Sequence, residues 1–405
     1  MKFKTYTMED ALEAIIDYRG KTPKKSDSGI PTLSAKSVKN NYIDYSLCYY
    51  ISPNEYKNFM VRGFPKIGDV LLTTEAPMGV VARLDRDDVA IAQRLLTLRG
   101  KKNILDNEYL LFFLQSPIGQ ALLKTRETGT TVTGIKQAEF RKIQINIPEI
   151  DIQRKIGGFL RTLNEKIEIN NKINENLEQQ ALALFRHYFI DFEPYGRSAP
   201  STWSKVSLDD VCTRITDGSH YSPSDVLGAP YPMYSVKNME TYGFDSTSCK
   251  HITAEDFHKM QKNDCVPKLN DILVAKDGSY LKEIFICSEE KDEAILSSIA
   301  IFRPNTKVII PEILLYLLKQ PSVRKDVGDN YVSGSALPRI VLKDFKKYTF
   351  LLPPMTEQLK IGAVLHAIRM QTKANIDEIQ NLSALRDTLL PQLMSGELDV
   401  SDIDL

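Results

Sequence analysis

Two stretches of the chain carry apolar residues at alternating steps of three and four, one from Leu160 to Tyr188 and one from Leu365 to Leu393. This spacing, held for about four heptads, is typical of the seam between paired helices. The positions are Leu160, Leu163, Ile167, Asn170, Asn174, Leu177, Ala181, Leu184 and Tyr188, then Leu365, Ile368, Thr372, Asn375, Ile379, Leu382, Arg386, Leu389 and Leu393. The pattern predicts two long helices, the first from about Lys155 to Tyr188.

Polar residues interrupt both seams, at Asn170 and Asn174 in the first and at Thr372, Asn375 and Arg386 in the second. Polar seam residues lower stability but fix register and partner. We expect the helices to pair with each other in antiparallel orientation, because the segment between them is long enough for the chain to return. The alternative is that each helix packs only on its own globular domain, which explains poorly why the remaining faces are so polar.

The segment before each helix has a mixed pattern. Short β-rich runs such as DVLLTT (69–74), VAIAQRLLTL (89–98) and KIQINIP (142–148) alternate with Gly, Pro and Asn, and a helix is expected around residues 107–125. The predicted fold class is α+β, with two mixed α/β domains, two long helices and an internal pseudo-twofold repeat. The expected bounds are 1–147 and 200–352 for the domains, and 148–195 and 353–398 for the helices.

One fourteen-residue segment occurs twice. IPEIDIQRKIGGFL (147–160) and LPPMTEQLKIGAVL (352–365) lie 205 residues apart and agree at six positions. Other landmarks return in the same order. They are SVKN at 37–40 and 235–238, PKIGDVL at 65–71 with PKLNDIL at 267–273, and NEYLLFFLQSP at 107–117 with PEILLYLLKQP at 311–321. The sequence therefore predicts a tandem duplication of one domain and one helix.

Composition and charge narrow the protein class. The chain is 42% hydrophobic and 26% charged, as in soluble globular proteins. Its apolar runs are too short to span a membrane, its first residues do not form a signal peptide, and its five cysteines are scattered. We therefore expect a cytoplasmic protein without a membrane partner. The net charge is zero, although residues 1–147 hold 22 basic and 16 acidic side chains. A strongly basic polyelectrolyte binder is excluded, whereas local basic clusters are not.

Motifs for catalysis are missing from the sequence. It contains no phosphate-binding GxxxxGK[ST], no GxSxG, no HExxH, no GxGxxG after a strand, and no methyltransferase loop. Cys249, His251, His258 and Cys265 are the best metal candidates, but their spacing matches no common zinc pattern. We expect a chain without an enzymatic activity, cofactor or metal of its own.

Polar loops of similar composition occur at matching places in both halves. Lys, Arg, Ser, Thr and glycine amides suit phosphates, and Asn, Gln, Arg and His read base edges. Solvated turns explain any single residue more simply, but recurrence in both halves favours the set. The candidate DNA contacts are Lys21, Thr22, Lys24, Lys36, Lys39, Asn40, Thr130, Thr131 and Lys136, and in the second half Ser219, His220, Lys237, Asn238, Lys276, Ser333, Ser335 and Arg339.

The doubled pattern P-x-x-x-x-Q-x-K-I-G, seen at Pro148 and again at Pro353, resembles the specificity subunits of type I restriction–modification systems. The ending LLPQLMSGEL (389–398) is also typical of that family, and the resemblance covers the whole chain. It implies a non-catalytic adaptor whose two domains each recognise half of a split site in double-stranded DNA. It also implies that the paired helices separate these domains and carry methyltransferase subunits, two being expected. Methylation, and cleavage where restriction and translocase subunits exist, would belong to those partners.

Several expectations follow from this resemblance. Because the two domains differ in sequence, the two half-sites should differ and the DNA site should be asymmetric. A helix from Lys155 to Tyr188 would span roughly 50 Å, enough to set half-sites roughly 34–36 Å apart. The near-neutral charge suggests that the partners supply part of the phosphate contact. Two alternatives stay open: a scaffold that binds only proteins, and the recognition module of a single-chain restriction enzyme.

Overall fold

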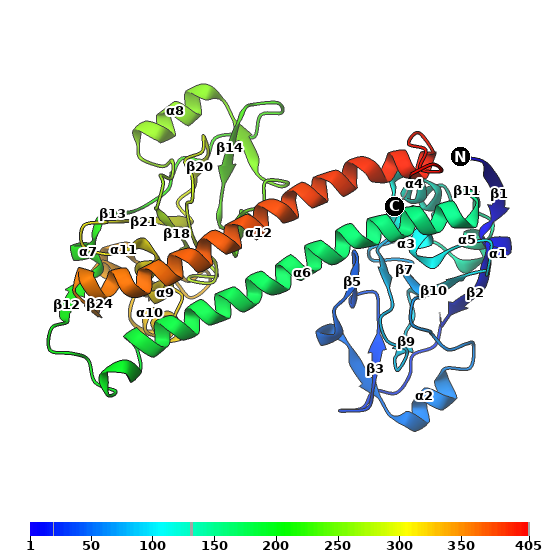
Figure 1. Cartoon of the computed structure of the whole chain (residues 1–405), viewed down its shortest axis with the longest axis horizontal. Helices are drawn as coiled ribbons and strands as arrows, with labels where there is room; N and C mark the ends of the chain where they lie inside the picture. The colour runs from blue at the N-terminus through cyan, green and yellow to red at the C-terminus, as the bar shows by residue number, and fades with distance from the viewer. Residues whose placement is uncertain (19, 130–132, 404–405) are drawn as a thin grey trace. The chain divides into compact units, whose positions relative to one another are not determined.

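The computed structural model describes residues 1–18, 20–129 and 133–403. The chain divides into two compact units, each built from segments that are distant in sequence. Unit 1 is Met1–Asn171 with Ile376–Leu405, and unit 2 is Lys172–Asn375. Two long helices, α6 (Ile150–Phe189) and α12 (Met355–Ser395), each pass from one unit into the other (Figure 1). Each unit therefore contains half of both helices.

The elements of unit 1 begin at the N-terminus. Its strands are β1 (Phe3–Thr7), β2 (Leu12–Asp17), β3 (Ile30–Leu33), β4 (Val38–Lys39), β5 (Tyr42–Ile43), β6 (Tyr49–Ile51), β7 (Val70–Thr73), β8 (Val81–Arg83), β9 (Ala90–Ile91), β10 (Leu95–Gly100) and β11 (Gln144–Pro148). Its shorter helices are α1 (Met8–Ala11), η1 (Tyr45–Leu47), α2 (Pro53–Phe59), α3 (Asn107–Gln115), α4 (Pro117–Thr125) and α5 (Gln137–Arg141).

Unit 2 repeats most of these elements. Its strands are β12 (Ser204–Ser207), β13 (Cys212–Asp217), β14 (Tyr231–Tyr234), β15 (Met239–Glu240), β16 (Gly243–Phe244), β17 (Lys250–Ile252), β18 (Ile272–Ala275), β19 (Ile284–Ile286), β20 (Ala294–Ile295), β21 (Ile299–Pro304), β22 (Val332–Ser333), β23 (Arg339–Ile340) and β24 (Thr349–Leu352). Its shorter helices are η2 (Glu193–Tyr195), α7 (Leu208–Val211), η3 (Val236–Asn238), α8 (Ala254–Lys262), α9 (Pro311–Leu318), α10 (Pro321–Asn330) and α11 (Leu342–Phe345).

The sheets of the two units have matching strand orders. A four-stranded sheet has the order β2-β10-β7-β8 in unit 1 and β13-β21-β18-β19 in unit 2. A three-stranded sheet, β6-β3-β9 or β17-β14-β20, and a pair of strands, β1-β11 or β12-β24, complete the match. The predicted tandem duplication is therefore present in the fold, and the α+β class is confirmed.

The helices α6 and α12 pair in opposite directions. In unit 1, Arg386 donates to Asn164 at 2.9 Å, and Asn170 donates to Glu378 at 2.7 Å. Residue numbers rise along α6 as they fall along α12, so the predicted antiparallel pairing is confirmed. All the predicted seam positions are buried or half-buried.

The ends of the paired helices also join the cores of the globular parts. Ile156 and Leu160 lie in the core of unit 1, and Phe185 and Phe189 lie in the core of unit 2. Each long helix thus both pairs with the other long helix and packs on a globular part, so the two alternatives considered for the sequence occur together.

The duplicated glutamine explains why similar sequences occur at the start of both long helices. The buried Nε2 of Gln153 donates to the carbonyls of Pro148 and Ile104, and its Oε1 accepts from the backbone N–H of Asp106. Gln358 makes the same three contacts in unit 2, with Pro353, Val308 and Ile310. A buried amide with all these partners satisfied ties the first turn of each long helix to the segment before α3 or α9.

The duplicated glycine allows a close approach between helices. A Cβ atom on Gly157 would lie 2.9 Å from the backbone nitrogen of Tyr109, at the start of α3. A Cβ atom on Gly362 would lie 2.6 Å from the side chain of Ile310. Neither contact is tolerable without a shift, so glycine lets each long helix pack tightly here.

Substitution of Gly157 by alanine is expected to destabilise unit 1 by about 1–3 kcal/mol, because the added methyl group meets backbone that cannot move freely. Gly158 is the matched control, since it lies on the same helix and a Cβ atom added there would meet nothing within 4 Å. Gly158→Ala should instead stabilise by up to about 1 kcal/mol through helix propensity. Urea unfolding of both variants tests this, and equal stabilisation by both would contradict the close packing.

A buried ion pair supports the PKIGD and PKLND turns. Asp69 accepts two hydrogen bonds from Arg99, at 2.8 and 2.7 Å, and Asp271 accepts two from Arg303, both at 2.8 Å. The preceding residue adopts a positive φ, +90° at Gly68 and +67° at Asn270. Glycine and asparagine are the residues that best tolerate this conformation.

One sequence-based element was wrong, and two others are more closely defined by the structure. The helix expected around residues 107–125 is two helices, because Pro117 forces Ser116 into an extended conformation with ψ of 156°. The run VAIAQRLLTL forms two strands in different sheets, β9 and β10. The first long helix begins at Ile150, inside the expected range 148–195 and five residues before the rougher value of about Lys155.

Candidate nucleic-acid interface

Each unit presents several loops at one edge of its four-stranded sheet. In unit 1 all neighbouring strands of that sheet are antiparallel. The end of β2, the start of β10, the end of β7 and the start of β8 consequently share one edge. Unit 2 has the same arrangement in β13, β21, β18 and β19. We call this the loop edge of each unit; the PKIGD and PKLND turns lie at the opposite edge.

Four segments of unit 1 meet at its loop edge. Gln93 Nε2 donates to Thr22 Oγ1 at 3.4 Å, and Arg94 Nε lies 2.8 Å from Glu75 Oε1. Glu75 also forms an antiparallel bridge with Gly134. These contacts bring together the loop after β2, the turn between β7 and β8, the β9–β10 connection and the loop before α5.

Lys36 lies on a turn that begins beside the same edge. Strands β3 and β9 run parallel, and the backbone N–H of Ala92 donates to the carbonyl of Leu33 at 2.8 Å. The turn after β3 and the β9–β10 connection therefore start side by side. Both Lys36 and Gln93 are exposed.

Unit 2 builds its loop edge around a buried lysine. Lys276 Nζ lies 3.0 Å from Asp217 Oδ2 and 3.3 Å from Asp277 Oδ1. His220 Nε2 lies 3.3 Å from the same Asp217 oxygen, and its side chain is exposed. The backbones of Asp277 and Arg339 form an isolated antiparallel β-bridge, which links the β18–β19 turn to the β22–β23 hairpin. The ionic cluster thus joins the end of β13 and the loop after it to the β18–β19 turn, and a backbone β-bridge adds the β22–β23 hairpin.

The small-polar loops predicted as a repeated pair occupy equivalent places. Ser333 pairs with Arg339 across the β22–β23 hairpin, and Thr128 forms a bridge with Gly134 in unit 1. The counterpart of Arg339 is therefore Gly134. A basic side chain at this point is a property of unit 2 alone.

The pairing of the two SVKN segments was wrong. In unit 2 the Asn238 side chain accepts a hydrogen bond from the backbone N–H three residues earlier, and in unit 1 Ser37 makes this contact. The counterpart of Lys237 is therefore Lys36, not Lys39. Ser37 is structurally equivalent to Asn238, so the two identical SVKN tetrapeptides are offset by three residues in the structure. The hydrogen bond of the turn, and not the identical sequence, identifies the equivalent residues.

The predicted contacts differ in exposure. The exposed ones are Lys21, Thr22, Lys24, Lys36, Asn40, Lys136, His220, Lys237, Ser333, Ser335 and Arg339. Lys39 is half-buried, and Ser219, Asn238 and Lys276 are buried. Ser219 and Asn238 bond within their own loops, whereas Lys276 pairs with Asp217 and Asp277. The buried three hold loops in place. Thr130 and Thr131 lie outside the described residues.

Three of the predicted DNA contacts, Lys24, Lys39 and Asn40, are held by contacts other than those that join the loop edge. Lys39 and Asn40 lie on the β4–β5 hairpin, whose turn bonds α3 and α6 through Asn41. Lys24 is held by its backbone N–H, which donates to Glu55 at 2.9 Å.

Sequence reasoning missed several exposed side chains at the loop edge. Gln93 and Arg94 form the tip between β9 and β10, and Arg94 has a φ of +72°. In unit 2, Tyr221 is exposed and Lys259 Nζ lies 4.7 Å from the centre of its ring. The adjacent polar residues inside VAIAQRLLTL were the available signal for Gln93 and Arg94. Tyr221 directly follows the candidate His220 in the same polar loop, which was the available signal for it.

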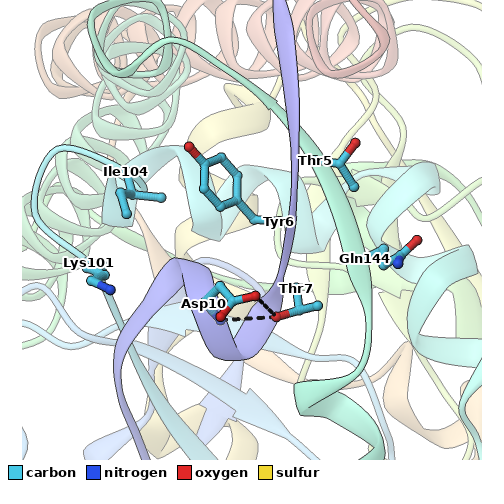
Figure 2. Close-up of a pocket in the computed structure, with 7 residues that line it drawn as sticks. All are labelled: Thr5, Tyr6, Thr7, Asp10, Lys101, Ile104 and Gln144. Atoms are coloured by element: carbon cyan, nitrogen blue, oxygen red, sulfur yellow. Dashed lines mark hydrogen bonds between the residues drawn. The ribbon is translucent and has the colours of Figure 1, made fainter.

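A shallow hollow of about 440 Å³ lies elsewhere in unit 1 (Figure 2). The side chains that line it are Thr5, Tyr6, Thr7, Asp10, Lys101, Ile104 and Gln144. Its acidic group is already used, because Thr7 Oγ1 donates to Asp10 Oδ2 at 2.6 Å and Thr7 Oγ1 accepts from the Asp10 backbone N–H. The hollow combines no nucleophile with a base, and we assign it no chemistry.

The metal candidates of the sequence are not assembled. Within residues 1–18, 20–129 and 133–403, no three His, Cys, Asp or Glu side chains are grouped to hold a metal ion. Cys249 and Cys265 instead lie near backbone carbonyls of Ser246 and Asn263. In the same described part of the chain, no helix is long and apolar enough to span a membrane.

The sequence profile of the type I restriction modification DNA specificity domain matches residues 2–179 and again residues 200–382. Two copies of one domain thus account for most of the chain. The chain belongs to the type I restriction–modification specificity family. The subunit is non-catalytic, and it functions in DNA target recognition and in assembly of the complex.

Curated relatives agree with this assignment. The chain is 27% identical to the type I restriction enzyme MjaIX specificity subunit of Methanocaldococcus jannaschii, over 92% of this chain and 88% of the relative. It is 22% identical to the EcoKI specificity subunit of Escherichia coli K12, over 94% of this chain and 86% of the relative. The match to a DNA specificity family favours DNA recognition over a scaffold that binds only proteins.

A solved structure supports the fold. The S subunit of the type I restriction–modification system of M. genitalium matches with a TM-score of 0.59 and 15% identity, covering 97% of this chain and 96% of that chain. The similarity in fold extends over both globular domains and both long helices.

Proposed function

We propose that the specificity subunit recognises a split, asymmetric DNA site, with one half-site recognised by each unit's loop edge. In this proposal residues 1–147 and 200–352 are the target-recognition domains. Residues 148–195 and 353–398 are the helices that join them and carry the other subunits of the complex. The proposal rests on one observation above all, that two equivalent loop edges have the same frame and different side chains.

The differences between the loop edges predict different half-sites. At the β9–β10 connection unit 1 has Gln93 and Arg94, whereas unit 2 has Ser297 and Ser298 in the corresponding connection. Arginine can donate two hydrogen bonds to guanine, and glutamine can donate one to adenine N7 while accepting one from adenine N6, whereas serine bonds either type. Two unlike readers in one chain require a DNA site without twofold symmetry.

The repeat also indicates how many partners bind. A partner that binds the structure common to both units would find two equivalent binding sites on one chain, so we propose two methyltransferase subunits for each specificity subunit. With a formal net charge of zero, the chain has no excess of basic side chains to attract the DNA phosphates. The partners are therefore expected to supply part of the phosphate contact, and the complex should bind DNA more tightly than the isolated subunit.

A domain exchange tests whether each domain reads one half-site. Residues 1–147 are replaced by the same segment of a relative, the chimera is co-expressed with its methyltransferase subunit, and methylated sites are mapped by sequencing. One half of the methylated sequence should change and the other should remain. A change in both halves, or in neither, would contradict one reader per half-site.

Lys36 and Lys237 are expected to contact DNA phosphates, because both are exposed at equivalent turns beside the loop edges. The slope of log affinity against log salt concentration is negative. Replacing either lysine by glutamine should make this slope less negative by about 0.9, with little effect on sequence preference. Fluorescence anisotropy of the assembled complex at several salt concentrations measures the slope.

The matched control for this experiment is Lys66→Gln. Lys66 is exposed in the same unit as Lys36, but it precedes β7 at the edge opposite the loops. Its replacement should leave the salt slope unchanged. An equal change in slope for Lys66→Gln would place the DNA elsewhere.

A further inference from the structure

In unit 2 the hairpin β15–β16 contacts the long helices through one tyrosine. The hydroxyl of Tyr242, in the turn of this hairpin, donates to the backbone carbonyl of Asn174 on α6 at 3.2 Å. Lys319, at the end of α9, places its Nζ 5.9 Å from the centre of the Tyr242 ring and 2.8 Å from Glu178 Oε1. The turn is therefore bonded to α6 and contacts the end of α9.

The helix side of this junction is itself fixed. Asn375 of α12 donates to the Asn174 side chain at 2.8 Å, and both asparagines are buried. Burial, followed by the charge of Glu178, raises the pKa of Tyr242 to about 12. The hydroxyl thus remains a donor throughout the physiological range and the contact does not depend on pH.

In unit 1 the equivalent hairpin makes the equivalent junction with different chemistry. Asn41 occupies the turn of β4–β5, and its Oδ1 accepts from Gln115 at the end of α3 at 2.8 Å and from Asn164 of α6 at 2.9 Å. Asn164 in turn accepts from Arg386 of α12 at 2.9 Å. Both hairpins therefore contact the end of a short helix and the long helix pair, through unrelated side chains.

Each hairpin begins directly after the turn that carries the proposed phosphate contact. Lys36 lies two residues before β4, and Lys237 lies two residues before β15. In each unit the hydrogen-bonded turn that includes the lysine leads straight into the hairpin. A hairpin bonded to the helices at its turn is a short, stiff connection between the helix pair and the loop edge.

We propose that the turns of these two hairpins, at Asn41 and Tyr242, are positioning contacts that orient each reading loop edge on the helix pair. The inference rests on the proposed function, since it assumes that the loop edges read DNA. Neither residue contacts DNA in this proposal. Each sets the angle between its loop edge and the long-helix segments of its own unit, and so governs the accuracy of one half-site only.

The test compares Tyr242→Phe with Asn41→Gly in the complex co-expressed with methyltransferase subunits. Phenylalanine removes only the hydroxyl, and glycine suits the φ of +74° at position 41 while removing the side chain. The complex methylates a DNA library in which each half of the mapped site is randomised separately. Sequencing then gives the preference at every position of both halves.

Tyr242→Phe should reduce discrimination about three- to tenfold in one half-site, and Asn41→Gly should reduce it by a similar factor in the other. The control is Tyr195→Phe, which removes a hydroxyl that donates to Glu357 of α12 at 3.1 Å from outside the hairpin. It should leave both half-sites unchanged, with a melting temperature shifted as much as by Tyr242→Phe.

Other outcomes overturn the proposal. Losses in the same half-site for both variants, equal losses in both half-sites, no loss, or an equal effect of Tyr195→Phe would each show that the hairpin turns only stabilise the fold. If the unmodified complex shows no sequence preference in either half, the proposed function itself fails, and that result is distinct from a failure of the hairpin variants.

Discussion

Replacing Asp271 by alanine is expected to lower the stability of unit 2 by about 3–5 kcal/mol, one of the two largest effects of a single substitution in this chain. The side chain of Asp271 is fully buried, and it accepts two hydrogen bonds from Arg303 and one from the backbone N–H of Lys268. Its removal leaves a largely buried guanidinium without its main partner. Hydrogen exchange of the β18 and β21 amides should increase before that of unit 1.

A matched control and a repeat test accompany this prediction. Glu289→Ala removes an ion pair with Lys291 in which both side chains are more than half exposed, and should cost under about 1 kcal/mol. Asp69→Ala should reproduce the large effect in unit 1, because Asp69 holds Arg99 in the same way. A small effect of Asp271→Ala, similar to that of Glu289→Ala, would contradict the buried pair.

The second large effect is expected from the ends of the long helices. Leu393, near the end of α12, is 1% exposed and belongs to the core of unit 1, although it lies at the far end of the sequence. Leu393→Ala should destabilise unit 1 by about 2–5 kcal/mol. Phe185, near the end of α6, is equally buried in the core of unit 2, and Phe185→Ala should destabilise that unit by about 3–5 kcal/mol.

The two substitutions should act on opposite units. Hydrogen exchange measured by mass spectrometry follows β10 of unit 1 and β21 of unit 2 in each variant. Each variant should increase exchange first in the unit whose core it changes. If Leu393→Ala increased exchange only in unit 2, the assignment of the C-terminal end of α12 to the core of unit 1 would be wrong.

The long helices were predictable because their signal is local. A step of three or four residues returns to the same helix face, so the seam from Leu160 to Tyr188 could be read from the residues alone. Gly396, which follows α12 with a φ of +80°, is an equally local signal for the end of a helix. The division of residues 107–125 at Ser116 was also available in the sequence, because a residue before proline avoids helical backbone, but the apolar pattern concealed it.

The candidate interface was predicted less well. Lys36 and Lys237 were both named, yet their equivalence was obscured by a coincidental SVKN three residues away. Lys276 was named as a contact, but Asp217 and Asp277 enclose it. Arg94 was missed because its run of sequence resembled one strand. Each of these errors concerns where a loop lies, and that depends on strands paired across tens of residues.

The sequence by itself determined the duplication, the two long helices with their antiparallel seam, and the family. All of these depend on residue spacing and on short motifs that act within a few turns of the chain. Only the tertiary structure decided which helix end completes which core, which lysine in one unit matches which in the other, and which polar side chains are buried. Those outcomes depend on contacts between residues that are distant in sequence, where packing and hydrogen bonding select one arrangement among several that the local pattern allows.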